Sequence, residues 1–230
     1  MKAISFRERG LVRLIPKTAH KPPVLRPLVD TDEEMAALAA LEGLTNGRLE
    51  VERDGLAGLD PRELAYQRRA ADLKVYGRHH INAAFSYTRP SGNRFNGPER
   101  GAWYCAFGPL TAIEEVGFHM TRELKHTDWL HQKVTYVELQ SDFVGKFPKL
   151  DQDNTADALD PDPDIGYPAG QALATAIQRA GHEGLLYPSV RHPDGRCFVA
   201  FAPHIVQNVR PGDSWDLVWD GSPLFTAISA

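Results

Sequence analysis

The stretch NRFNGPERGAWYCAFGPLTAIEEV, residues 93–116, decides the fold because it joins three local patterns. A loop rich in Gly, Pro and Asn is followed by a short apolar run typical of a buried strand, and then by the first turns of an amphipathic helix. Arg94, Tyr104 and Glu115 fall one in each segment. A cation, an aromatic hydroxyl and a carboxylate brought together can hold and polarise an anionic, nucleotide-like ligand. The alternative is an ordinary loop, strand and helix of a mixed α/β domain.

The expected helix places Glu115 on its polar side. This helix is predicted to begin at Pro109, and its apolar stripe is formed by Leu110, Ile113, Met120 and Leu124. On the helical wheel Glu115 lies nearly opposite that stripe, so it cannot be a core residue. It is expected to face either solvent or a cleft.

Size and charge fit one substantial domain, or one domain with an appendage. The chain has 230 residues, of which 42% are apolar and 9% aromatic, as in ordinary globular proteins. A formal net charge of −4 gives no electrostatic reason to expect nucleic-acid binding. No apolar run approaches the roughly 18 residues of a membrane span, and no signal peptide is recognisable. Cys105 and Cys197 lie in apolar runs and are expected to be buried, reduced thiols. A soluble, cytoplasmic protein is therefore expected.

Residues 1–75 are predicted to form an N-terminal arm with a helical extension. Four prolines within residues 1–30 favour extended chain with few backbone hydrogen bonds. One helix is predicted over residues 31–43, with a capping box at Thr31–Glu34. A second helix is predicted over residues 60–77, because a proline stands at its first turn and a glycine after its last.

Residues 76–230 are predicted to form a compact α+β domain. Strands are predicted over residues 80–87, 103–107, 133–139, 184–187 and 197–201. Besides the helix that begins at Pro109, a second helix is predicted over residues 168–180. Loops are predicted over residues 89–100 and over the aspartate-rich residues 141–166.

Several familiar sites are not indicated. The aspartates of residues 151–157 lack the glycine and the glutamate of a calcium loop. His79 and His80 are adjacent, but the His and Cys spacings of a zinc site do not occur, so no metal is expected. Neither the glycine-rich nucleotide-binding motifs nor GxSxG occurs. Four candidates remain: Arg94, Tyr104, Glu115 and Ser189.

These residues carry a resemblance to the RES-domain family, the toxins of bacterial Xre–RES toxin–antitoxin pairs, which is named for an arginine, a glutamate and a serine. The segments NRFN, WYCA and AIEEVGFH resemble its central motif and supply Arg94, Tyr104 and Glu115. The spacings of ten and eleven residues between them agree with the family pattern and select Glu115 over Glu114. The serine falls on Ser189 in YPSVR, and the following FVAFAP resembles the family's closing strand.

The resemblance covers about residues 76–210 and departs from the family pattern at identifiable points. The usual tryptophan after the arginine is Phe95, and an asparagine-containing late strand is altered at residues 195–197. Another arginine usually lies nearer the domain start, and Arg78 is the best candidate for it. On this basis residues 1–75 lie outside the RES domain.

The resemblance implies a fold similar to diphtheria-toxin-like ADP-ribosyltransferases, with a mostly antiparallel β core flanked by helices. It also implies consumption of NAD⁺ through the N-glycosidic bond between nicotinamide and ribose, whose transition state resembles an oxocarbenium ion. Some relatives use water or phosphate as the acceptor of ADP-ribose. Others modify a protein, including the enzyme that makes phosphoribosyl pyrophosphate.

The resemblance further implies roles and partners. Arg94, Tyr104 and Glu115 would be catalytic, and Arg78 and Ser189 would join Arg94 and Tyr104 in holding NAD⁺. The implied partner is a helical, DNA-binding antitoxin of the Xre type that covers the NAD⁺ cleft, and the acceptor substrate would be a protein. Direct contact with nucleic acid or membrane is not expected. Two alternatives stay open: an NAD⁺ glycohydrolase or phosphorylase, and a non-catalytic nucleotide-binding or interaction module.

Overall fold

A seven-stranded antiparallel sheet organises the protein. The computed structural model describes residues 1–20, 31, 33–34, 47–64, 76–151 and 156–230. Its strands are β1 (Ala3–Pro16), β2 (Trp103–Ala106), β3 (His131–Pro148), β4 (Gly184–Pro188), β5 (Arg196–Ala200), β6 (Gln207–Asp220) and β7 (Thr226–Ser229). They lie in the order β4-β5-β2-β1-β3-β6-β7, and each neighbouring pair is antiparallel. The α+β class expected from the sequence is therefore confirmed.

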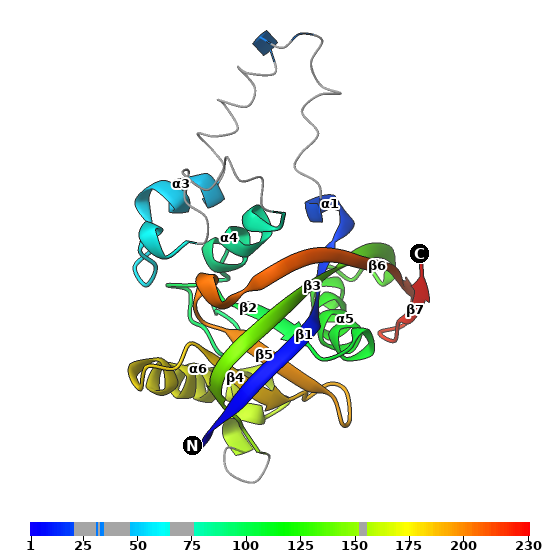
Figure 1. Cartoon of the computed structure of the whole chain (residues 1–230). Coiled ribbons are helices and arrows are strands. Elements are labelled where there is room, and N and C mark those ends of the chain that lie inside the picture. Colours follow the sequence, from blue (N-terminus) through cyan, green and yellow to red (C-terminus); the bar gives the residue numbers. More distant parts are fainter. Residues whose placement is uncertain (21–30, 32, 35–46, 65–75, 152–155) are drawn as a thin grey trace.

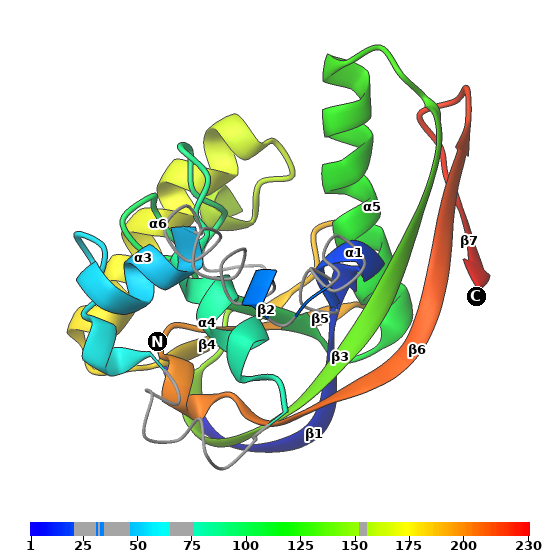
Figure 2. The ribbon, with the colours of Figure 1, turned by 90° about the horizontal axis from the view of Figure 1, so that it is seen from above.

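Helices pack around this sheet. They are α1 (Lys17–His20), α3 (Gly47–Asp54), α4 (Arg78–Ser86), α5 (Pro109–His126) and α6 (Pro163–Arg179), with 3₁₀ turns at Pro61–Glu63, Ala156–Leu159 and Pro203–Ile205. Figure 1 shows the long strands β1, β3 and β6 sweeping across the molecule. In Figure 2, α5 and α6 stand apart with β2 between them.

Successive side chains of a strand point to opposite faces of the sheet, so the buried residues form two cores, one on each face. In β2, Trp103 and Cys105 belong to one core and Ala106 to the other, which Tyr104 also borders. The first core takes in apolar residues of α4, and the second takes in those of α5 and α6. Tyr104 and α5 are therefore on the same side of the sheet, as the expected site requires.

The strand at 103–107 and the helix from Pro109 are confirmed as β2 and α5. The strands predicted at 184–187 and 197–201 are confirmed as β4 and β5. One residue of the predicted apolar stripe is wrong, because Leu110 is 61% exposed. It lies in the first turn of α5, where the neighbouring residues Thr111 and Ala112 are the buried ones.

The expected N-terminal arm is wrong for residues 3–16, which form β1 in the middle of the sheet. Leu11, Val12 and Leu14 are buried there. The prolines that favoured an arm stand at residue 16 and beyond, while arginines interrupt the apolar pattern before it. This part of the N-terminal segment therefore belongs to the sheet of the main domain.

The predicted helices of residues 31–77 are found only in part. Thr31 and Glu34 form the expected capping box, and the rest of the 31–43 helix lies outside the described residues. The element that begins at Asp60 is a 3₁₀ turn with a capping box, and at Leu64 the backbone is extended. Residues 65–75 lie outside the described residues. Gly77, with φ of 85°, caps the start of α4 instead of ending a helix.

The predicted strand at 80–87 is wrong, because residues 78–86 form α4. Ile81, Ala84 and Phe85 are spaced i, i+3 and i+4 and are buried together, which is the helical period. In so short a segment, apolar residues at these positions fit a strand or a helix. Packing against the sheet selects the helix.

Other predicted boundaries are wrong in one direction: the regular elements are longer. β3 continues to Pro148, so the aspartate-rich loop begins after it and not at residue 141. α6 begins at Pro163, with Pro168 inside the helix. Residues 207–229 contain β6 and β7, which the sequence pattern did not indicate. Pairing with β3 orders β6 in spite of its many polar residues.

Deleting residues 1–16 is expected to prevent cooperative folding. β1 buries five apolar side chains, Phe6, Leu11, Val12, Leu14 and Ile15. At about 1.5–3 kcal/mol each, their loss approaches the whole stability of about 5–15 kcal/mol that a domain has. Circular dichroism during thermal unfolding measures this. Deletion of residues 226–230, which include the exposed strand β7, is the control and should preserve the transition. A cooperative transition in the chain lacking residues 1–16 would contradict the central position of β1.

Candidate active site

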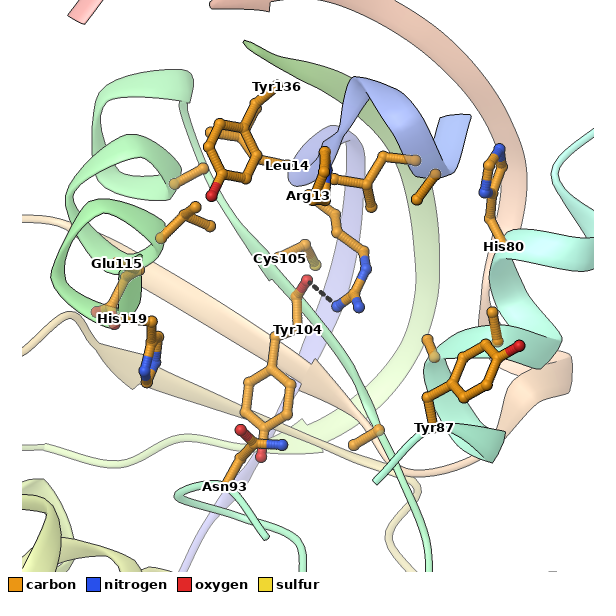
Figure 3. A pocket seen from close by; sticks show the side chains of 18 of the residues that line it. Arg13, Leu14, His80, Tyr87, Asn93, Tyr104, Cys105, Glu115, His119 and Tyr136 are labelled. Atoms are coloured by element: carbon orange, nitrogen blue, oxygen red, sulfur yellow. Dashed lines mark hydrogen bonds between the residues drawn. The ribbon is translucent and has the colours of Figure 1, made fainter. Parts of the chain in front are cut away.

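One large cavity brings together the three residues of the 93–116 stretch. Its volume is about 940 Å³, and Arg94, Tyr104 and Glu115 all line it. Figure 3 shows the Tyr104 side chain of β2 extending towards Asn93, with Glu115 and His119 of α5 on one side and His80 and Tyr87 on the other. A cavity of this size with a few converging polar groups is typical of a small-molecule or cofactor site.

Tyr104 presents its ring to the cavity, while its hydroxyl fastens the arginine loop. The hydroxyl donates to Asn96 Oδ1 at 2.8 Å and accepts from the Phe95 amide at 3.0 Å. Asn96 in turn donates through Nδ2 to the carbonyls of Gly97 and Arg100. Burial raises the pKa of Tyr104 well above its ordinary value, so the hydroxyl stays protonated. Tyr104 therefore offers a flat, uncharged face whose position is fixed by the loop.

Arg94 is held rigidly at the cavity wall. It is only 8% exposed, and its Nη1 donates to the carbonyls of Ala158 at 2.9 Å and Asp160 at 2.8 Å. A Cβ at Gly166 would collide with this nitrogen, and the Tyr167 ring lies 5.6 Å from the guanidinium carbon. Since one nitrogen carries both carbonyl bonds, the rest of the planar fork can serve a ligand.

A hydrogen bond from Ser189 fixes Glu115. Ser189 Oγ donates to Glu115 Oε1 at 2.6 Å and accepts from the amides of Arg191 at 3.1 Å and His192 at 3.0 Å. Two amides thus orient the hydroxyl towards the carboxylate. Ser189 is 8% exposed and is not among the residues that line the cavity. Ser189 therefore acts on the site indirectly. Its hydroxyl positions the carboxylate of Glu115, which lies 74 residues earlier in the chain.

Arg78 does not reach the cavity lining, and its Nη1 is buried with no hydrogen-bond partner among the described residues. Arg13 of β1 lines the cavity instead and donates to the Tyr104 carbonyl at 3.3 Å. The ladder between β1 and β2 consists of Val12 opposite Ala106, and the Arg13 side chain bridges the strands beyond it. Burial lowers the pKa of Arg13. Sequence reasoning missed Arg13 because it treated its strand as an arm.

Three further cavity residues were not among the predicted site residues: Tyr167, Arg191 and His119, the last residue of the segment AIEEVGFH that carries the resemblance. His119 stands four residues after Glu115, so both side chains lie on one face of α5. This spacing was the available signal for His119. Tyr167 and Arg191 come from α6 and from the segment after β4, and no local pattern connects them to residues 93–116.

Histidines line the opposite end of the cavity. The rings of His79 and His80 are 3.8 Å apart between centroids, and His20 stacks on His80 at 5.8 Å. His20 Nε2 also lies 2.8 Å from the Tyr76 hydroxyl. Burial, followed by the charge of His79, lowers the pKa of His80 to about 3. Burial therefore keeps the His80 imidazole neutral at neutral pH, and the guanidinium groups of Arg13 and Arg48 also line the cavity.

The expectation of buried, reduced cysteines is confirmed: Cys105 and Cys197 are both free and buried. Burial raises the pKa of each thiol, which disfavours the nucleophilic thiolate. Within the described residues, no group of three or more His, Cys, Asp or Glu side chains could hold a metal ion. A search of the same residues for a helix long and apolar enough to cross a membrane finds none.

Replacing Tyr104 by Phe is expected to separate the role of its hydroxyl, which holds the loop of residues 93–96, from the role of its ring, which faces the cavity. The ring stays, but the Phe95 amide and Asn96 Oδ1 lose their partner. An unsatisfied buried group costs about 1–3 kcal/mol, so the melting temperature should fall. Ligand binding should weaken less than in Tyr104→Ala, which also removes the ring. Calorimetry measures both quantities, and equal stability of Tyr104→Phe and the parent chain would contradict this description.

A comparison with protein families finds that the model described as RES domain matches residues 68–220. This match includes every residue of the site except those contributed by β1, α1 and α3. A comparison with curated proteins finds no significant match.

Proposed function

Because the chain belongs to the RES-domain family of NAD⁺-using toxins, we propose that it breaks the bond between nicotinamide and ribose in NAD⁺ and transfers ADP-ribose to a protein. The observation that carries the proposal is the Glu115 carboxylate, held by Ser189 at the wall of a cavity that also presents Arg94 and Tyr104. Together these residues supply an anion, a cation and an aromatic face for one ligand.

The carboxylate suits the charge that develops on the ribose. When the glycosidic bond breaks, its electron pair leaves with the nicotinamide nitrogen, and positive charge develops at C1′ and the ring oxygen. A fixed carboxylate stabilises this charge without reorganising during the reaction. The hydrogen bond from Ser189 holds one oxygen of Glu115, which leaves the other free to accept from a ribose hydroxyl.

Arg94 and Tyr104 complement this role. The free part of the Arg94 fork can donate to the diphosphate or a ribose hydroxyl. The ring of Tyr104 can stack on nicotinamide, and its protonated hydroxyl adds no competing charge. The acceptor then attacks C1′ and loses its proton, so the products are nicotinamide and an ADP-ribosylated acceptor.

The acidic loop at residues 156–162, beside the cavity, supports a protein acceptor. The carbonyls of Ala158 and Asp160 in this loop bind Arg94, and the Pro161 carbonyl accepts from Arg191. A protein docked on the loop would therefore lie next to the reacting ribose. The enzyme that makes phosphoribosyl pyrophosphate is one candidate target. We further propose that an Xre-type antitoxin blocks the same cavity mouth.

Labelled NAD⁺ tests the acceptor. The protein is incubated with cell lysate and NAD⁺ that carries the label in its adenosine half. Label on a polypeptide band would support protein transfer. Label found only in free ADP-ribose would identify a glycohydrolase, and label only in a phosphorylated ADP-ribose would identify a phosphorylase. Glu115→Gln in the same lysate is the matched control, because it excludes modification by other enzymes.

A further inference from the structure

An excess of positive charge surrounds His119 at one side of the cavity. Burial, followed by the charges of Arg89, Arg191, Arg122 and Arg94, lowers the pKa of His119 to about 4. These arginines come from separate places: the segment after α4, the loop before β2, α5 itself and the segment after β4. Arg89, Arg94, Arg191 and His119 all line the cavity. Side chains from four segments thus converge on one place.

This charge is poorly neutralised within the protein. Arg89 pairs with Glu123 at 3.3 Å on the exposed surface. In the described part of the chain, neither Arg94 nor Arg191 forms an ion pair with a carboxylate. The side chains of Arg94 and Arg191 donate hydrogen bonds to neutral backbone carbonyls. Concentrating like charges is unfavourable unless an anion joins them, and the net charge of −4 shows that the cluster is local.

Contacts with Phe118 and Pro161 hold the Arg191 side chain in one position at the cavity. Its guanidinium carbon lies 3.3 Å from the centroid of the Phe118 ring, and its Nη2 donates to the Pro161 carbonyl. Glu115 acts on Arg191 electrostatically, but no ion pair joins the two side chains. A guanidinium that is stacked on one face keeps its remaining in-plane donors for an acceptor with several oxygens.

His119 supplies an independent sign of a missing ligand. Its Nδ1 is buried and has no hydrogen-bond partner among the described residues. A buried polar nitrogen without a partner is unfavourable, so a ligand that supplies an acceptor would be favoured. The charged and titratable groups around His119 are the four arginines, Glu115 and Glu123 one turn before and after it on α5, and Tyr167 of α6, with the Phe118 ring beside it.

We infer that Arg89, Arg94, Arg191 and His119 form a phosphate-binding subsite, which receives the diphosphate of a dinucleotide beside Glu115. This rests on the proposed function and deepens it, because it fixes how the substrate lies. The ribose joined to nicotinamide would sit at Glu115 and the diphosphate against the arginines. His119 would donate to a phosphate oxygen through Nδ1.

The subsite is tested by binding without turnover. ADP-ribose carries the diphosphate but no nicotinamide, and inorganic phosphate is the second probe. Arg191→Met keeps the hydrocarbon stem over Phe118 and the backbone amide that binds Ser189, but removes the charge. A lost charge-assisted hydrogen bond of about 1.5–3 kcal/mol should weaken ADP-ribose binding at least about tenfold. Arg179→Met, at the exposed end of α6, is the control and should change it less than about twofold.

The titration of His119 gives a second readout. An anion within hydrogen-bond distance should raise the pKa of His119 by about one to three pH units, as measured by NMR. ADP-ribose keeps its diphosphate charge between pH 5 and 7, so its affinity should increase as the pH falls through the raised pKa. This increase should be absent in His119→Gln. A purely structural role of His119 would not produce it.

The outcomes separate the subsite from the reaction. ADP-ribose binding that depends on Arg191 supports the subsite even if nicotinamide is never released. Binding of inorganic phosphate but not of ADP-ribose would assign the subsite to a free phosphate. NAD⁺ cleavage together with ADP-ribose binding that is unchanged in Arg191→Met and His119→Gln would overturn it. Failure of both probes to bind the folded parent protein would overturn it as well.

Discussion

Glu115→Gln is expected to lower the rate of nicotinamide release from NAD⁺ by about a hundredfold to a thousandfold, the range seen when one preorganised electrostatic group is removed. Gln has nearly the same shape, and its carbonyl oxygen can still accept from Ser189 Oγ. Only the negative charge is lost. The ground state binds without that charge, but the oxocarbenium-like transition state depends on it. The effect should therefore appear in kcat and leave KM nearly unchanged.

The matched control for this prediction is Glu114→Gln. Glu114 is the preceding residue on α5 and does not line the cavity. Glu114→Gln should keep the rate of nicotinamide release within about twofold of that of the parent chain. Both variants should unfold at nearly the same temperature as the parent chain. Full activity of Glu115→Gln, or equal losses in the two variants, would contradict the assignment of Glu115.

Arg94→Lys is expected to weaken substrate binding by about tenfold to a hundredfold, the effect of losing about 1.5–3 kcal/mol of charge-assisted hydrogen bonding. The Arg94 fork binds two carbonyls through Nη1 and still presents other nitrogens to the cavity. An ammonium group has one nitrogen, which cannot sit between both carbonyls and also reach a ligand in the same plane. The change should appear mainly in KM, measured from initial rates of nicotinamide release.

Arg179→Lys is the control for Arg94→Lys, because Arg179 is exposed and does not line this cavity. It should not change KM. A tenfold loss in Arg94→Lys that appears only in kcat would indicate that Arg94 acts in the chemical step instead. Unchanged kinetics in Arg94→Lys would show that its fork does not bind the substrate.

Local patterns were enough to predict the part of the fold that carries the site. The apolar run at Trp103 and the amphipathic period after Pro109 are specified within a few residues, so β2 and α5 were predicted correctly. The same period places Glu115 away from the apolar stripe, and the structure selects the cavity over solvent for it. The strand β2 and the helix α5 are determined by residues close together in the chain, so the sequence is enough to predict them.

Features that depend on distant pairing could not be predicted in this way. β1 is a strand because β3 pairs with it along its whole length, and nothing in residues 3–16 reveals that partner. Arg13 was missed for this reason. Ser189 was found through the family resemblance, but its bond to Glu115 depends on how the segment after β4 returns to α5. The helix α4 was missed because a short apolar segment fits two periods.

The most direct test of the central claim is the release of nicotinamide from NAD⁺ by the purified protein, followed by mass spectrometry with and without cell lysate. The proposed function predicts nicotinamide in stoichiometric match with ADP-ribose, either free or attached to an acceptor, and its near absence with Glu115→Gln. No nicotinamide from the folded parent protein under either condition would contradict the claim and would leave a binding module in place of an enzyme.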